Sequence, residues 1–182
     1  MAVAQTLSLL APAKLNLFLH VLGQRPDGYH DLQSAFRCIS LFDALHLACL
    51  SGSQALTLTC DTDLGDPQDN LVLRAAELLQ QRSGTRFGAQ LTLEKQIPVG
   101  AGLGGGSSDA AAVLVGLNHL WSLDFSKAQL QRIGADLGAD IPFFIQGGDA
   151  WVSGLGEHIE PLSLPESWYV VGYPRVVIPT AE

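Results

Sequence analysis

The sequence predicts strands first and helices after them, an order typical of an α+β domain whose mixed β-sheet is packed by helices. Two-residue alternation of apolar side chains dominates the first third of the chain, and helical periodicity follows it. A glycine-dense turn joins one expected strand to an apolar helix near the middle of the chain. With 182 residues, of which 47% are apolar and 15% charged, the chain is long enough for one well-buried core.

The expected strands begin close to the N-terminus. Residues 6–10 and 15–22 are expected to be strands, the second because apolar and other side chains alternate along it. Lys14 and Asn16 share one face by the two-residue period. A turn-rich loop is expected at residues 23–28. Two further strands, forming a meander, are expected at residues 44–49 and 55–60.

Polar caps mark two of the expected helices. The first helix begins at Asn70 or the residue before it and ends near Gly84, with one apolar face that covers the sheet. Ser126 and Gln129 form a capping box for a later helix, which Gly138 closes. After it we expect a buried turn at residues 140–142 that leads into residues 143–145, and more strands at residues 150–152 and 168–172.

The most informative stretch is PVGAGLGGGSSDA, residues 98–110, which follows an expected strand at residues 90–95. Five of its seven residues 100–106 are glycines, which permit positive φ and close approach of the backbone to a ligand. Ser107 or Ser108 can cap the next helix, whose free N–H groups attract an anion. We expect a phosphate-binding loop; the alternative is a glycine-rich connection to a buried helix.

That next helix is expected from Ser108 to about Trp121, and it is apolar almost all round, which predicts a central, buried position. The loop before it matches the dinucleotide fingerprint GxGxxG, but that fingerprint needs a second parallel strand with an acidic residue at its end. Here Asp124 falls in a turn between two expected helices. The Walker A pattern fails as well, because no Lys-Ser or Lys-Thr follows the last glycine.

The glycine stretch, as PVGAGLGGGSSDAA, resembles the ATP loop of the small-molecule kinases that include galactokinase, homoserine kinase, mevalonate kinase and phosphomevalonate kinase. Four other motifs resemble those of one branch of this family. The enzymes of that branch act on a cytidine diphosphate sugar alcohol in the non-mevalonate route to isoprenoids. They are PAKLNL at residues 12–17, RPDGYHDL at 25–32, DNLV at 69–72 and LGADIPFF at 137–144. Five motifs in the right order make a more specific match than one loop.

The resemblance implies an α+β ATP-binding domain over residues 1–160, followed by the start of a second, substrate-side domain that is absent after residue 182. It implies an ATP- and Mg²⁺-dependent transfer of phosphate to a hydroxyl group of that small molecule. By carry-over, Asp140 orients or deprotonates the hydroxyl, while Lys14 keeps Asp140 ionised and stabilises the transferring phosphoryl. The alternatives are a helix-end turn residue for Asp140 and a solvated strand end for Lys14.

The resemblance also implies two sets of binding residues. On the substrate side, Tyr29 stacks on cytosine and His30 binds the base edge, whereas the alternative is a local aromatic cluster; Asn16 and Phe36 complete this side. Ser107 or Ser108 is the candidate Mg²⁺ ligand, and Asp109 helps to hold the metal or complements the helix N-terminus. The ATP-contacting positions are Pro98, Gly100, Ala101, Gly102, Leu103, Gly104, Gly105, Gly106, Ser107 and Ser108.

Asn70 and Lys95 match positions that contact the adenosine part of ATP in that family. Each has an equally weighted alternative, since asparagine is a good helix cap and a strand often ends in a lysine. The competing functions are another kinase of the same family and a nucleotide-binding module or fragment without turnover.

Charge and cysteine content exclude other classes of function. The net charge is −8 with no basic run, which argues against nucleic-acid binding, including an RNA-binding module. The three cysteines have no metal-ligand spacing, so we expect reduced core residues of a cytoplasmic protein rather than a zinc site or disulfides. No segment has the length and apolar character of a membrane span. The sequence does not indicate an oligomeric state.

Overall fold

The computed structural model describes residues 5–25, 28, 30–66 and 69–174. The fold is α+β, as predicted, with one mixed six-stranded sheet and helices packed against it. Its elements in chain order are β1 (Thr6–Gln24), β2 (His30–Leu50), β3 (Leu56–Cys60), α1 (Leu71–Ser83), β4 (Gly88–Glu94), α2 (Gly105–Leu120), α3 (Lys127–Ala135), α4 (Ile141–Gln146), β5 (Asp149–Gly154) and β6 (His158–Leu162).

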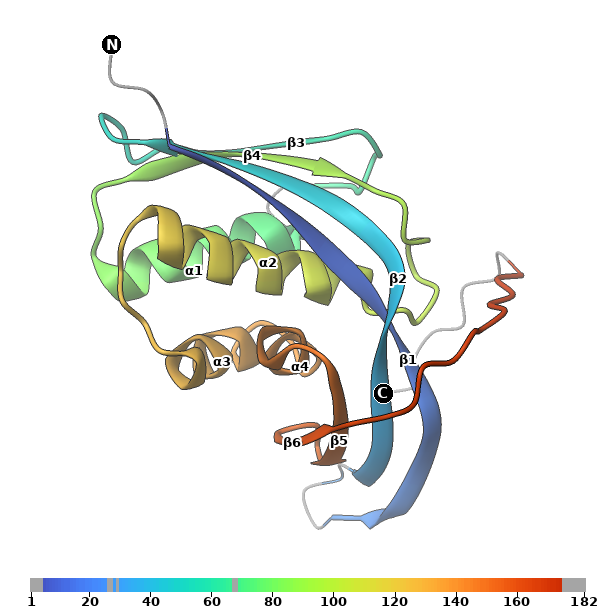
Figure 1. Ribbon diagram of the computed structural model, residues 1–182. Helices are drawn as coiled ribbons and strands as arrows, with labels where there is room; N and C mark the ends of the chain where they lie inside the picture. Colours follow the sequence, from blue (N-terminus) through green and yellow to red (C-terminus); the bar gives the residue numbers. More distant parts are fainter. Residues whose placement is uncertain (1–4, 26–27, 29, 67–68, 175–182) are drawn as a thin grey trace.

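Strand β2 is the spine of the sheet. It pairs with β1 along most of its 21 residues, and all of its partners are antiparallel. On its other edge, residues 44–50 pair with β4, whereas residues 32–36 pair with β5. The long β1–β2 ribbon therefore connects two regions of the molecule, one with α1 and α2 and one with β5 and β6 (Figure 1).

The main core lies between the sheet and the helices α1 and α2. Leucines of β2 and β4 that share one face, such as Leu47 and Leu91, are buried against the apolar face of α2. Helix α2 approaches the sheet closely at Gly116, where an added Cβ would lie 2.4 Å from Leu47 Cδ1. The prediction of a central, buried helix is confirmed, since nine of the 16 residues of α2 are buried.

Most of the helix ends that local patterns predicted are confirmed, but α3 ends at Ala135 with Asp136 as its C-cap, so the prediction that Gly138 closes this helix is wrong. Asn70 caps α1 by accepting a hydrogen bond from the Val72 N–H, and Gly84 ends that helix at φ 66°. Ser126 and Gln129 form the reciprocal capping box of α3. The prediction that Ser107 or Ser108 caps α2 is wrong, because α2 starts earlier and its N-cap is Gly104.

Several expected strands differ from the structure. Residues 6–10 and 15–22 belong to the single strand β1, which continues through Gln24 into the expected loop. The meander is wrong, because β3 pairs in parallel with β4 and not with β2. Residues 143–145 lie in helix α4, no strand is assigned at residues 168–172, and the strand β6 was not expected.

Candidate active site

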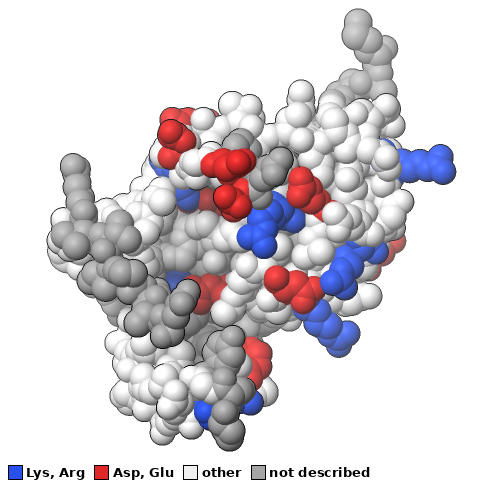
Figure 2. Space-filling view, turned by 180° about the vertical axis from the view of Figure 1, so that it is seen from behind, with Lys and Arg blue, Asp and Glu red and all other residues white. Residues whose placement is uncertain are grey.

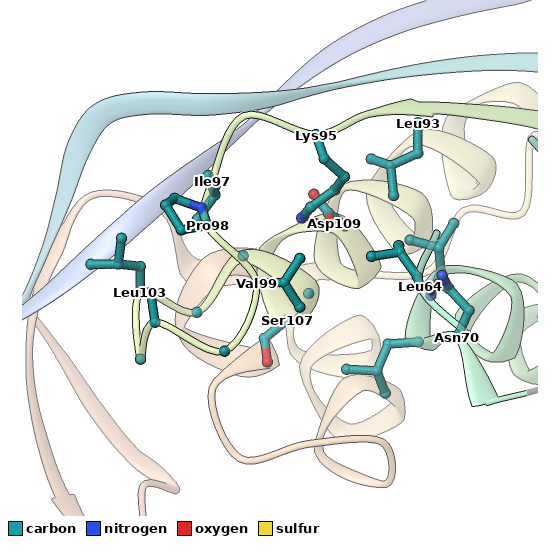
Figure 3. A pocket seen from close by; sticks show the side chains of 18 residues that line it. Leu64, Asn70, Leu93, Lys95, Ile97, Pro98, Val99, Leu103, Ser107 and Asp109 are labelled. Carbon is teal, nitrogen blue, oxygen red and sulfur yellow. Dashed lines mark hydrogen bonds and ion pairs between the residues drawn. The ribbon is translucent and has the colours of Figure 1, made fainter. Parts of the chain in front are cut away.

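The glycine loop predicted to bind phosphate borders a pocket. Residues 95–104 connect β4 to α2. Within this connection Gly100, Gly102 and Gly104 have φ values of 72°, 73° and 71°, which residues other than glycine rarely adopt. The hollow beside the loop has a volume of about 380 Å³, within the range of small-ligand sites. Figure 3 shows it between the loop on one side and Leu64 and Asn70 on the other. All ten predicted ATP-contacting positions of the loop line it except Ser108.

The first turn of α2 lines this hollow, and no side chain caps the N-terminus of the helix. Its N-cap is Gly104, which has no side chain that could accept a hydrogen bond from the N–H groups of the first turn. Such free N–H groups, at the positive end of the helix dipole, favour an anion. The arrangement is therefore suited to a phosphate group.

The two serines of the loop face different surroundings. Ser107 lines the hollow, whereas Ser108 is buried and lines a separate apolar depression with Leu9, Pro12 and Phe144. The Ser108 hydroxyl has no hydrogen-bond partner among the described residues. The geometry therefore favours Ser107 over Ser108 for a ligand in the hollow.

Lys14 and Asp140 lie together, although 125 residues separate them in the chain. The Lys14 ammonium is 3.4 Å from an Asp140 carboxylate oxygen, with only 6% of the lysine side chain exposed and 33% of the aspartate. Lys14 also donates to Asn16 Oδ1 at 2.8 Å and lies 4.2 Å from the centre of the Phe36 ring. Three of these predicted site residues thus surround one buried cation.

The pair borders the glycine loop. The Lys14 backbone N–H donates to the carbonyl of Leu103 at 2.8 Å. A Cβ added to Gly104 would lie 3.0 Å from Lys14 Cγ and 2.9 Å from the Phe144 ring. Asp140 is the N-cap residue of α4, but its carboxylate makes no capping hydrogen bond, so it remains available beside Lys14. An acid, a cation and the glycine loop therefore meet at one place.

Lys95 directly follows the end of β4 and is part of a buried ion cluster. Its ammonium lies 2.7 Å from Asp109 Oδ2 and also contacts Asp43, with 6% of the lysine side chain exposed. Burial raises the pKa of Asp109 to about 7 in spite of the nearby lysine. Burial lowers the pKa of Lys95, but the two carboxylates outweigh it and the net shift is upward.

Asp109 therefore lies within α2 as the partner of Lys95, and it does not complement the helix N-terminus, since the first turn of α2 has no acidic residue. Sequence reasoning missed Asp43. The signal was present, because Asp43 is an acid in a mostly apolar strand, with the same two-residue phase as the buried Leu45 and Leu47. A charge on the core face of a strand indicates a buried partner.

The remaining predicted residues lie in two places. Asn70 both caps α1 and lines the hollow, so the two readings of this residue coexist. His30 is exposed at the start of β2, opposite Gln24 of β1. Tyr29 lies outside the described residues.

No pre-formed metal centre is found in the described part of the chain, where no three His, Cys, Asp or Glu side chains gather as ligands. Cys38, Cys49 and Cys60 are free and half-buried, so they lie at the edge of the core rather than inside it as expected. Among the described helices, none is long and apolar enough to cross a bilayer. Figure 2 shows one face of the molecule, on which acidic and basic side chains are interspersed.

Gly104→Ala is expected to destabilise the protein more than Gly102→Ala. Both residues have positive φ, which costs an alanine roughly 1–2 kcal/mol. Only at position 104 would the new methyl group also collide, with Phe144 and Lys14, whereas nothing lies within 4 Å at position 102. Urea denaturation of both variants measures the difference, for which we expect about 1 kcal/mol or more. Equal losses would show that Lys14 and Phe144 move aside easily.

Comparison with known proteins agrees with this geometry. The family model described as GHMP kinases N terminal domain matches residues 70–148, which include Asn70, the glycine loop, α2 and Asp140. A curated relative from Ralstonia pickettii (strain 12J), named 4-diphosphocytidyl-2-C-methyl-D-erythritol kinase, is 53% identical over 93% of this chain and 58% of its own length. The chain thus spans about three fifths of that relative.

Solved structures extend the likeness to the fold. A crystal structure of 4-(cytidine 5'-diphospho)-2C-methyl-D-erythritol kinase superposes with a TM-score of 0.76 and 43% identity, covering 87% of this chain and 56% of that one. A homoserine kinase from Cytophaga hutchinsonii shares the fold at a TM-score of 0.67 and 19% identity, covering 88% of this chain and 52% of its own. The chain therefore belongs to the GHMP kinases and carries their N-terminal domain.

Proposed function

We propose that the protein catalyses the ATP-dependent phosphorylation of the 2-hydroxyl group of 4-diphosphocytidyl-2-C-methyl-D-erythritol, a step of non-mevalonate isoprenoid precursor synthesis. The observation that carries the proposal is the Lys14–Asp140 pair at 3.4 Å beside the glycine loop. The name of the relative that is 53% identical supplies the substrate. Because the chain spans only part of that relative, the activity is proposed for the whole protein.

In this proposal the glycine loop holds the phosphates of ATP. The backbone N–H groups of the loop and of the first turn of α2 bind the anion, and the glycines leave room for it. The adenosine part contacts Asn70 and Lys95, which line the same hollow. Mg²⁺ would neutralise phosphate charge, held by the phosphates and by Ser107 or Ser108. The free hydroxyl of Ser107 in the hollow fits such a role.

Asp140 and Lys14 act on the acceptor. The Asp140 carboxylate accepts a hydrogen bond from the substrate hydroxyl and takes up its proton as the phosphoryl group is transferred. The neighbouring Lys14 ammonium stabilises the negative charge of the transferring group. Asn16 and the Phe36 ring hold the Lys14 ammonium in place for this.

The part of β2 between His30 and Phe36 is long enough to lie along an elongated acceptor. His30 and Phe36 are six residues apart on this strand, which corresponds to about 20 Å at 3.3 Å per residue. We propose that the cytosine binds near Tyr29 and His30 and that the sugar alcohol reaches Asp140. Residues 1–160 form the ATP-binding part in this proposal, and the residues after them lead toward a substrate-side part.

The direct test measures ADP release by the purified protein with ATP, Mg²⁺ and one of three acceptors, which are 4-diphosphocytidyl-2-C-methyl-D-erythritol, homoserine and mevalonate. We expect ADP release that depends on the cytidine diphosphate acceptor and the appearance of a new phosphomonoester in ³¹P spectra. Preference for homoserine or mevalonate would assign another substrate. Binding of ATP with no acceptor-dependent turnover would indicate a nucleotide-binding module.

Tyr29→Ala is expected to weaken binding of the cytidine ligand by roughly 1–3 kcal/mol, the contribution of stacking a base on an aromatic side chain. Binding of an ATP analogue is expected to stay unchanged. Competition by CDP measures the effect, and Phe87→Ala, at the other end of the sheet, is the matched control. Unaltered CDP competition in Tyr29→Ala would remove the cytosine site from this loop.

A further inference from the structure

The two ends of the glycine loop are joined by a buried chain of charges. Lys95, at the end of β4, contacts Asp43 of β2 and Asp109 of α2 through one ammonium group. Lys95 precedes the loop, and Asp109 follows it within the first two turns of α2. Figure 3 shows Lys95 and Asp109 directed toward each other across the base of the loop.

Asp43 binds each of the three residues at the entry of the loop, Lys95, Gln96 and Ile97. One of its carboxylate oxygens accepts the backbone N–H groups of Gln96 at 2.6 Å and of Ile97 at 2.8 Å. The other oxygen binds the Lys95 ammonium. The residue is fully buried, at 0% exposure, so these partners replace all of its water. Three consecutive residues before Pro98 are thus fixed by one side chain.

The loop after these residues depends on such an anchor. Three of its glycines have positive φ, and glycine restricts the backbone less than any other residue. Ile97, held by Asp43, is 2% exposed and packs with Leu103 of the same loop. Fixing Ile97 therefore limits where the phosphate-facing glycines can lie.

We propose that Asp43 is a positioning residue for nucleotide binding, which holds the glycine loop in its anion-binding shape through Gln96, Ile97 and the Lys95–Asp109 pair. This inference rests on the proposed function, in which the loop binds ATP. Asp43 does not touch the ligand, since it is fully buried and the hollow is lined by Lys95 and Asp109 in its place.

Asp43→Asn separates the anchor from the charge. The amide oxygen can still accept from the two backbone N–H groups, but the amide NH₂ group cannot accept a hydrogen bond from Lys95. Lys95 then keeps only Asp109 as a partner. A lost hydrogen bond to a charged group corresponds to about a tenfold change in an equilibrium constant, or more. We expect the KM for ATP to rise by about this factor, with little change in the KM for the acceptor.

Asp149→Asn is the control, because Asp149 also forms an ion pair that is largely shielded from solvent, with Arg37 at 3.2 Å, but lies on β5 away from the loop. The control is expected to leave the KM for ATP unchanged. An equal rise in both variants, or a rise in the two KM values alike for Asp43→Asn, would overturn the proposal.

Hydrogen exchange of the ligand-free protein tests the anchor without any variant. The amides of Gln96 and Ile97 are expected to exchange much more slowly than those of Ala101 to Leu103. If they exchange equally fast, the anchor is not formed and the inference is wrong. Failure of the parent protein to bind an ATP analogue would instead contradict the proposed function, and the exchange result would still decide whether Asp43 holds the loop.

Discussion

Asp140→Asn is expected to lower kcat by about 10²- to 10⁴-fold, the usual contribution of a positioned general base. Asparagine has the same size but cannot take up the proton of the acceptor hydroxyl. Lys14 would keep its hydrogen bond to Asn16 and its contact with Phe36, so the local structure is expected to persist. Affinity for ATP is expected to stay nearly unchanged, since the carboxylate acts on the acceptor.

Titration calorimetry with a non-hydrolysable ATP analogue and single-turnover kinetics separate these two effects. Asp136→Asn is the matched control: Asp136 is half exposed at the end of α3 and pairs with Arg82, away from the loop. It should leave both quantities unchanged. A tenfold or greater loss of nucleotide binding in Asp140→Asn would place this carboxylate on the nucleotide side of the site.

Two helix starts that depend on neighbouring residues were predicted correctly. The cap at Asn70 and the capping box at Ser126 and Gln129 are made within four residues, so the local pattern contains the whole interaction. The shared face of Lys14 and Asn16 follows from the strand period and is confirmed by their hydrogen bond.

Elements that depend on distant partners were not predicted. Strands β3 and β4 pair in parallel, and α1 is the connection between them in the chain. No local sequence signal distinguishes this arrangement from a meander. The strand at residues 168–172 was expected from its apolar residues, but Trp168 and Val170 are fully exposed. An apolar run without a pairing partner does not form a strand.

The candidate site also has one part that the local sequence predicted and another that depends on distant residues. The loop was predicted from its glycines, whereas the pairing of Lys14 with Asp140 came from the family resemblance, since 125 residues separate the two in the chain and no periodicity relates them. Asp43 was missed because its partners are 52–54 residues away. Its charge on a core face was visible, but its partner was not.

Lys14→Met is expected to lower kcat by about 10²- to 10³-fold, the effect of removing one electrostatic contact to a transition state. Methionine fills a similar volume, and the backbone N–H of residue 14 would still donate to Leu103, so the loop keeps that support. Without the ammonium, the Asp140 carboxylate loses its cation and the transferring phosphoryl loses a positive charge. ATP binding is expected to change much less than turnover.

Lys127→Met is the control that isolates this charge. Lys127 lies at the exposed start of α3, and among the described residues its ammonium donates only to the carbonyl of Gln146. Both variants remove one positive charge from a protein of net charge −8, so a general electrostatic effect would lower both rates alike. A loss confined to Lys14→Met in single-turnover kinetics assigns the effect to the Lys14–Asp140 pair. Retention of most of the turnover would remove Lys14 from the mechanism and leave Asp140 to act without a cation.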